Sequence, residues 1–307
     1  MMQPKVNRRS VESEVSNSSS IRNILDVAMH KCDLTKGVFR CVEDSDPNDD
    51  YRVFKVEDYA NNKYIIKILP FSNGASSIMT LEKPLFESGE ECFFDLVSDF
   101  TTPVSTGFVF NHESCEEVSD VSPQFLKNSS GLLAKALKTL HNTSSSIPKP
   151  SLDDLDKSTP ESIKNALAFI MEETKTNNPK TCLFASSKND IYLSRNGHDF
   201  SFKFLDLSSS SLHNPVLDIA IMYMLFRLDK ESLEAFCVSY GDKTVTSESV
   251  LGFYDHACLL LYIKDLAEGQ KRLALSRDLS KILEKSKNKK IKEHYKEIND
   301  NRDIQAK

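Results

Sequence analysis

The sequence predicts an α+β chain in two parts, a smaller sheet-containing part followed by a mainly helical part. Up to about residue 111, apolar residues alternate with polar ones, which is typical of half-buried strands. After residue 122, apolar residues recur at helical spacing instead. A hydrophobic content of 39% and a charged content of 27% are those of a chain that buries a core rather than staying unfolded.

The first part is expected to begin with a helix and to continue with strands. Ser20 is a suitable N-cap for a helix over IRNILDVAMHKC. The alternating segments GVFRCVE and YRVFKVEDY predict a hairpin, and NKYIIKILPF and PVSTGFVFN predict two further strands. Between these two strands we expect a helix from about Ser88 to Val97.

The second part is expected to be helical apart from one strand pair. Ser122 and Pro123 are typical of a helix start, and the following residues place leucines on one face up to Leu140. A second helix is predicted over TPESIKNALAFIMEET, and a short strand pair surrounds Gly197. Helical segments are then predicted over residues 215–240, 246–270 and 275–300.

The boundaries follow from these changes of pattern. We expect a disordered tail over residues 1–19, because this stretch is polar and rich in serine. A sheet-containing lobe over 20–111 is joined by a hinge over 112–121 to a helical lobe over 122–300. Residues 301–307 form a C-terminal tail.

Composition and charge exclude several classes of function. A net charge of −6 gives no field to attract nucleic acid, so no nucleic-acid partner is expected. The seven cysteines are dispersed and include no C-x-x-C pair, which indicates reduced thiols in a cytoplasmic or nuclear protein. No apolar run is long enough for a membrane span, and the N-terminal residues lack the apolar core of a secretory signal.

Four stretches of the chain carry a family resemblance. They are YIIKI at 64–68, FESGEECFFDLV at 86–97, LLAKALKTLHN at 132–142 and FLDLSSSSLHNPVLDIAIMYM at 204–224. In this order they resemble the aminoglycoside phosphotransferase and choline kinase group of the protein-kinase-like superfamily, and within it the ecdysteroid-kinase-like (CHK-kinase-like) branch. The resemblance implies a bilobal kinase-like fold, ATP and Mg²⁺ as cofactors, and phosphoryl transfer to an alcohol group.

Lys67 is the residue that would hold the nucleotide phosphates. Its apolar neighbours, Ile66 and Ile68 among them, predict a strand that is buried on both faces, where a lysine needs a partner or a ligand. By resemblance that partner is Glu91, with Glu90 as the alternative register. The other interpretation is an exposed lysine opposite a solvent-facing glutamate.

Two aspartates of the helical part also match the family. Asp206 ends an apolar strand, and the resemblance implies that it binds Mg²⁺ between the phosphates; the other interpretation is an acid that caps a turn. Asp218 resembles a helix acid that holds the backbone of the catalytic loop, a structural role that does not require activity.

The catalytic loop departs from the family pattern H-G-D-x-x-x-x-N. Phe184, Ala185 and Ser186 stand in place of His, Gly and Asp, so Ser186 occupies the position of the catalytic base. A serine hydroxyl has no useful basicity near neutral pH. Ile191 stands at the metal-binding Asn position, or Asp190 takes that position if one residue is deleted from the loop.

Three hypotheses remain from the sequence. The first is a pseudokinase that binds a protein partner or a small-molecule ligand and catalyses little or nothing. The second is an active small-molecule kinase with a displaced acid, such as Asp190. The third is an unrelated α+β interaction protein in which the order of motifs is accidental.

Overall fold

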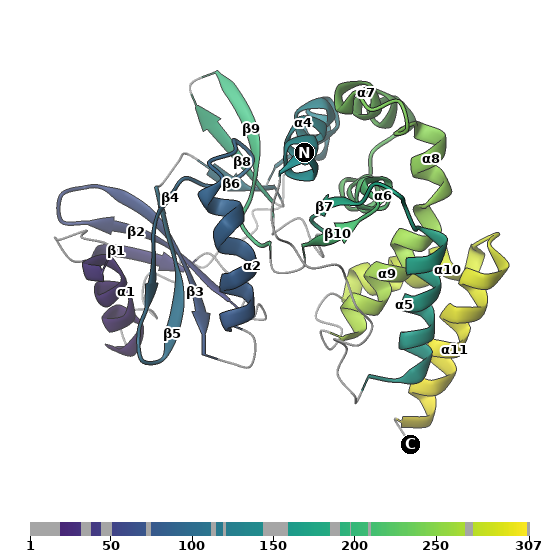
Figure 1. Ribbon diagram of the computed structural model, residues 1–307, viewed down its shortest axis with the longest axis horizontal. Coiled ribbons are helices and arrows are strands. Elements are labelled where there is room, and N and C mark those ends of the chain that lie inside the picture. The colour runs from purple at the N-terminus through teal and green to yellow at the C-terminus, as the bar shows by residue number, and fades with distance from the viewer. Residues whose placement is uncertain are drawn as a thin grey trace, which may run out of the picture. The chain divides into compact units, whose positions relative to one another are not determined.

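The structure is a computed structural model in which two compact units are distinguished (Figure 1). The first unit comprises Met1–Gly89 and Phe94–Glu113, and the second comprises Glu90–Phe93 and Ser114–Lys307. The residues that the structure describes are 19–31, 38–43, 51–71, 75–111, 115–118, 121–143, 159–184, 191–196, 198–207, 210–267 and 273–305. Among their helices, none combines the length and the apolar character that a membrane crossing requires.

The first unit is a five-stranded antiparallel sheet with one helix packed on each face. The strand order is β1-β2-β3-β5-β4. Its elements are α1 (Ser19–Lys31), β1 (Val38–Glu43), β2 (Arg52–Asp58), β3 (Lys63–Pro70), α2 (Ala75–Glu87), β4 (Leu96–Thr101) and β5 (Ser105–Asn111). No described strand from residues 180–206 joins this sheet, which agrees with the predicted separation of a sheet-containing part from a helical part.

Strand periodicity divides the side chains of the central strands between the two faces of the sheet. On one face Ile66 and Val109 form a core with Met29 of α1. On the other face Phe108 lies edge-on to Phe86 of α2, with ring centroids 5.2 Å apart. Because both faces are covered, β3 is buried from Tyr64 to Leu69. Lys67 therefore occupies an interior position.

Gly107 of β5 lies against the backbone of β3. A Cβ atom at this position would lie 2.0 Å from the carbonyl oxygen of Lys67. The close approach of the two strands therefore requires glycine here.

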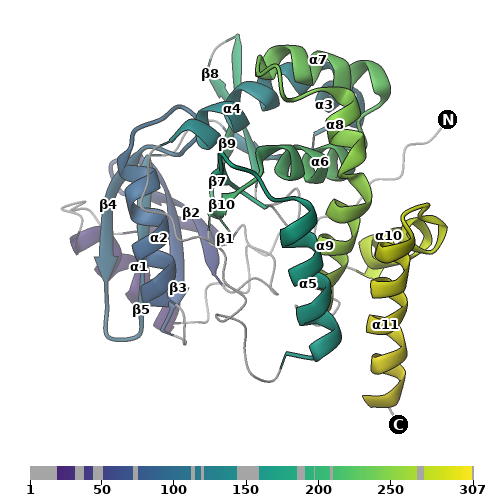
Figure 2. The same cartoon turned by 45° about the vertical axis from the view of Figure 1, so that its right-hand side comes forward.

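The second unit combines helices with two small antiparallel sheets, β6-β8-β9 and β7-β10. Helices α5, α9, α10 and α11 pack side by side within it (Figure 2). Its elements are β6 (Cys115–Glu117), α3 (Pro123–Asn128), α4 (Ser130–Asn142), α5 (Glu161–Glu173), β7 (Lys180–Cys182), β8 (Ile191–Asn196), β9 (Asp199–Phe204), β10 (Ser211–His213), α6 (Pro215–Phe226), α7 (Lys230–Tyr240), α8 (Ser247–Gly252), α9 (Tyr254–Ala267), α10 (Leu273–Lys285) and α11 (Lys289–Gln305).

Helix α6 is the buried helix of this unit. Asn214 caps it by accepting a hydrogen bond from the Val216 N–H, and Pro215 occupies its first turn. Most of its side chains are buried, and Asp218 is its single charged residue. Arg227 ends the helix in the left-handed conformation (φ 50°).

A short piece of the N-terminal sequence belongs to the second unit. The Cys92 carbonyl accepts a hydrogen bond from the Phe204 N–H at 2.9 Å. The Phe93 carbonyl accepts one from the buried Lys203 ammonium at 3.0 Å. Residues 90–93 thereby extend the edge of β9.

Several predicted boundaries need correction. The helix predicted from Ser88 to Val97 is wrong, because the helix between the two strands is α2, which ends at Glu87. Gly89 follows it with a positive φ of 69°, a conformation that terminates helices, and β4 begins at Leu96. The segments 215–240, 246–270 and 275–300, each predicted as helical, contain two helices each. In the second of them, Phe253 separates α8 from α9.

The predicted ends and the predicted hinge fall as follows. The predicted tail 1–19 lies outside the described residues except for Ser19, which begins α1. At the other end, α11 continues to Gln305, into the predicted tail 301–307. One division between the two units falls between Glu113 and Ser114, within the segment 112–121, and the role of this segment as a hinge stays a prediction.

Candidate functional site

Lys67 and Glu82 form a fully buried ion pair within the first unit. The Lys67 Nζ on β3 lies 2.7 Å from Oε1 and 2.9 Å from Oε2 of Glu82 on α2, and both side chains are 0% exposed. The ammonium also lies 4.5 Å from the centroid of the Tyr51 ring, within the range of a cation–π interaction. The alternative that Lys67 is an exposed strand lysine is therefore wrong.

The predicted partner of Lys67 was also wrong. Glu90 and Glu91 are exposed and lie in the turn that follows α2, whereas Glu82 forms the ion pair. Glu82 shares a helix face with Leu85 and Phe86, three and four residues further on, and both are buried. An acid at apolar helical spacing was the available signal, but the helix predicted from Ser88 to Val97 placed the expected acid at Glu91 instead.

A buried ion pair of this kind gives little net stability, because desolvation of the two charges offsets their attraction. In phosphoryl transfer enzymes, a lysine held by a helix glutamate is placed to contact nucleotide phosphates. Lys67 on a strand, held by Glu82 on a helix, has this arrangement.

Asp218 is the centre of a second buried cluster, which lies in the second unit. Its Oδ2 accepts a hydrogen bond from the Leu183 N–H at 2.7 Å, and its Oδ1 accepts one from the Phe184 N–H at 2.8 Å. The predicted structural role of Asp218 is confirmed for Leu183 and Phe184, the two residues that lead into the predicted catalytic loop.

His141 and Tyr240 complete the surroundings of Asp218. The His141 Nε2 lies 3.0 Å from Asp218 Oδ2, and its Nδ1 lies 2.7 Å from the Tyr240 hydroxyl. In a neutral imidazole, the Nε2–H donates a hydrogen bond to the carboxylate, and Nδ1 accepts a hydrogen bond from the Tyr240 hydroxyl. Burial raises the pKa of Tyr240, so its hydroxyl stays protonated and can donate.

Cys182 lies in the same cluster, and the ligand atoms of His141, Cys182 and Asp218 all lie within 4.8 Å of one another. A metal would need the cysteine as thiolate. Burial, and then the nearby Asp218 charge, raise the pKa of the Cys182 thiol well above its ordinary value. Both Asp218 oxygens already accept hydrogen bonds, so the cluster fits a hydrogen-bonded structural role better than a metal site.

Both backbone polar groups of Phe184 are hydrogen-bonded to side chains. Asp218 accepts its N–H, and the Lys264 ammonium on α9 donates to its carbonyl at 2.6 Å. Its φ of 51° is unusual for a residue other than glycine, and such strain is common at functional sites. Lys264 was not singled out from the sequence, because its contact spans 80 residues and depends on the fold.

The loop itself, with Ser186 and Asp190, lies outside the described residues. Ile191, at the family's Asn position, is 0% exposed in β8 and pairs with Phe204, so it belongs to the core. Asp206 follows β9 and is half-buried between the buried Leu205 and Leu207. An acid at this point suits the metal-binding role implied by the resemblance. Lys67 and Asp206 belong to different units, and their convergence on one cleft remains a prediction.

Comparison of the sequence with protein families and with curated proteins found no match. The fold, however, matches many solved structures. A choline/ethanolamine kinase family protein from Mesorhizobium loti superposes with a TM-score of 0.60 at 14% identity, covering 90% of this chain and 96% of that one. Choline kinase LicA from Streptococcus pneumoniae gives 0.58 at 15% identity, covering 86% and 98%. A macrolide 2'-phosphotransferase type I gives 0.57 at 11% identity, covering 85% and 97%.

The chain has a protein-kinase-like fold. The kinase-like fold accounts for the order of the elements, with a sheet carrying the buried lysine before a helical part in which Asp218 holds a loop. The placement within the ecdysteroid-kinase-like branch is not tested by these matches and stays a prediction.

Proposed function

We propose that this protein is a pseudokinase of the small-molecule-kinase-like superfamily, a binding or scaffold protein with little or no phosphotransferase activity. The observation that carries the proposal is the hydrogen bonding of Asp218 to Leu183 and Phe184. Because Asp218 holds the two residues that precede position 185, it supports the alignment that puts Ser186 at the base position.

The proposal retains nucleotide binding as a separate property. Lys67, held by Glu82, would contact the phosphates, and Asp206 would hold Mg²⁺, which would neutralise phosphate charge when bound. Two structural neighbours support this, because the solved structures include LicA in complex with AMP and the aminoglycoside phosphotransferase APH(4)-Ia with ADP and hygromycin B. The partner would be a protein or a small molecule in the cytoplasm rather than a nucleic acid.

The alternative is an active ATP-dependent kinase that phosphorylates a hydroxyl group with a displaced acid. Asp190 is the candidate acid, since it immediately precedes β8 and would take the family's Asn position if one residue were deleted from the loop. The hypothesis of an unrelated α+β protein is not compatible with the kinase-like fold.

The test is an assay of purified protein with ATP, Mg²⁺ or Mn²⁺, and choline, ethanolamine, aminoglycoside and sterol acceptors. Loss of a general base typically costs about 10²–10⁴-fold in rate, so we expect no turnover approaching ~1 s⁻¹, the lower end of ordinary enzymes. Turnover above that value that Asp206→Ala abolishes would overturn the pseudokinase proposal. If Asp190→Ala abolished it as well, the displaced-acid alternative would be the better account.

Two further variants examine the site assignments independently of the parent's activity. Ser186→Asp restores a carboxylate at the base position, and a gain of turnover would support the loop register. Lys67→Met should reduce the thermal shift produced by ATP and Mg²⁺. Lys63→Met is its matched control, because Lys63 is an exposed lysine on the same strand.

A further inference from the structure

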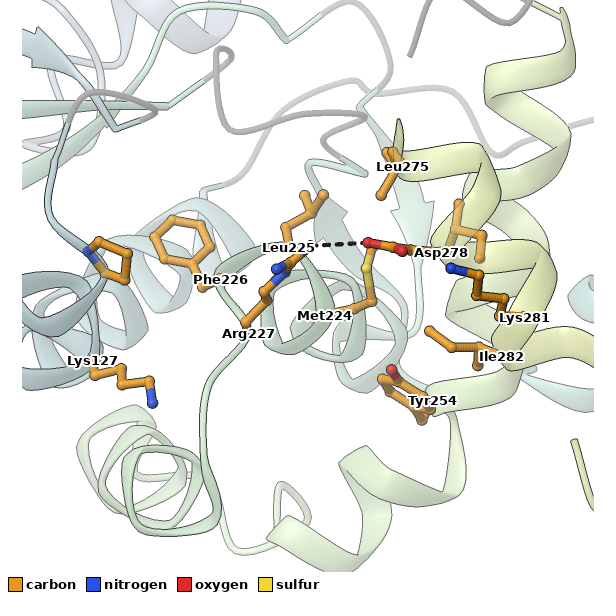
Figure 3. A pocket seen from close by; sticks show the side chains of 12 residues that line it. Lys127, Met224, Leu225, Phe226, Arg227, Tyr254, Leu275, Asp278, Lys281 and Ile282 are labelled. Carbon is orange, nitrogen blue, oxygen red and sulfur yellow. Dashed lines mark hydrogen bonds and ion pairs between the residues drawn. The ribbon is translucent and has the colours of Figure 1, made fainter. Parts of the chain in front are cut away.

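A cavity of about 870 Å³ lies within the second unit, and its lining includes none of Asp218, His141, Cys182 and Tyr240. Helices α3, α6, α9 and α10 supply most of its lining (Figure 3). It lies at the C-terminal end of α6, whereas Asp218 is in the first turn. The seven residues from Asp218 to Leu225 correspond to about 10 Å along the helix axis.

The middle of the cavity is apolar. Met224, Tyr254, Leu275 and Ile282 come from three helices and are each only half-buried, although Leu279 beside them is fully buried. Apolar side chains left partly open around one shared hollow are typical of a ligand site.

The ends of the cavity are cationic. Lys127 and Lys281 lie at opposite ends in Figure 3, with Met224 and Tyr254 between them, and Arg227 is a third cation of the lining. Against these three cations, Asp278 is the single acid of the lining. The lining is therefore net positive, whereas the whole chain has a net charge of −6.

Among the described residues, the ion pairs at the rim leave one cation without a partner. Arg227 lies 3.0 Å from Asp278, and Lys127 lies 3.0 Å from Asp229 outside the lining. Within the part of the chain that the structure describes, Lys281 has no ion pair or hydrogen bond. An anionic head group could therefore approach Lys281 without displacing an existing pair.

We propose that this cavity binds a small amphiphilic anion, a carboxylate or sulfonate on an alkyl or aryl body. The apolar middle would take the body of the ligand, and Lys281 would pair with its head group. The volume is in the usual range of small-molecule sites, about 300–1,000 Å³. A protein partner would instead require a larger complementary surface, of about 1,000 Å² or more in total.

The experiment is isothermal titration of the full chain with dodecanoate below its micellar concentration. Dodecyltrimethylammonium and dodecanol serve as cationic and neutral ligands with the same alkyl chain. We expect saturable binding of one dodecanoate per chain, and binding at least about 10-fold weaker for the cationic ligand, about 1.4 kcal/mol. Equal binding of the three ligands, or no saturable binding of dodecanoate, would overturn the proposal.

Variants locate the binding. Lys281→Glu should weaken dodecanoate binding about 10-fold, and Lys285→Glu is the matched control, an identical charge change on an exposed lysine of α10 outside the lining. Met224→Trp should also weaken binding by filling the apolar middle without a change of charge. Circular dichroism and thermal unfolding verify that each variant is folded. The proposal fails if Lys281→Glu and Lys285→Glu have equal effects, or if an acidic amphipathic peptide binds here while dodecanoate does not.

Discussion

The two units of the chain each bury a carboxylate completely, and they compensate its charge in different ways. In the first unit, Glu82 faces a lysine ammonium, so one full charge offsets another. In the second unit, Asp218 accepts hydrogen bonds from two backbone N–H groups and from His141. Replacing a buried ion pair by apolar side chains is often neutral or stabilising, so we expect the Lys67–Glu82 pair to serve a use beyond stability. Asp218, in contrast, has a structural role in the hydrogen bonds that it accepts from the backbone.

The largest expected effect is that of Asp218→Ala. It leaves the Leu183 and Phe184 N–H groups and His141 without their acceptor, and each buried unsatisfied donor costs about 1–3 kcal/mol. We expect the free energy of unfolding to fall by about 4–6 kcal/mol in urea denaturation. Asp218→Asn, which keeps an acceptor oxygen, should lose less. Equal losses would show that the charge of the carboxylate, rather than its acceptor geometry, carries the effect.

Lys67→Met should lower the free energy of unfolding by about 3–5 kcal/mol, because it leaves the Glu82 charge buried and unpaired. Adding Glu82→Leu should restore most of this loss, since an apolar pair has no desolvation cost. Urea denaturation of the two single variants and of the double variant gives the coupling free energy between Lys67 and Glu82. Additive losses in the double variant would contradict the comparison, because the pair would then contribute like two independent structural residues.

Lys264→Met is expected to cost about 1.5 kcal/mol, because its hydrogen bond from a charged donor to the Phe184 carbonyl is only partly buried. Hydrogen exchange should show faster exchange of the Phe184 amide, while amides of the first unit stay unchanged. Lys264→Arg, which keeps a cationic donor, is the control. Unaltered exchange at Phe184 in the Met variant would leave Asp218 as the sole support of this backbone.

His256 provides the smallest effect, since its imidazole nitrogens are buried with no hydrogen bond among the described residues. Its ring stacks on Phe169 at 5.7 Å, and burial lowers its pKa, although Glu173 and Asp255 oppose this shift. The folded state therefore holds fewer protons than the unfolded state below about pH 6.5, and stability falls as the pH falls.

Replacing this imidazole with a ring that cannot titrate isolates its contribution. His256→Phe should remove about 1 kcal/mol of the loss in stability between pH 7 and pH 5.5. Urea denaturation at several pH values measures the slope. A residual slope is expected from His213, whose pKa burial also lowers. An unchanged slope in the variant would show that His256 is protonated in the folded state.

Much of this fold could be predicted from the sequence, because strand alternation and helical periodicity are local. The strand of Lys67 and the helix of Asp218 were identified in this way, the latter with its Asn-Pro start. Glu82 was missed because the predicted helix began only at Ser88, whereas α2 spans Ala75–Glu87 and includes Pro84, a residue that usually disrupts a helix interior. His141 lies 77 residues from Asp218 and 99 residues from Tyr240 in the sequence, so no local pattern predicts its hydrogen bonds with them.

Residues 90–93 have a consequence for the synthesis of the chain. They leave the ribosome more than a hundred residues before Phe204, whose N–H donates to the Cys92 carbonyl, so this contact forms only after β9 has been translated. A gene fragment that begins at Ser114 would lack the Cys92 and Phe93 carbonyls, and Lys203 would lose one of its acceptors. A single cut in the gene therefore cannot separate this chain into two complete units.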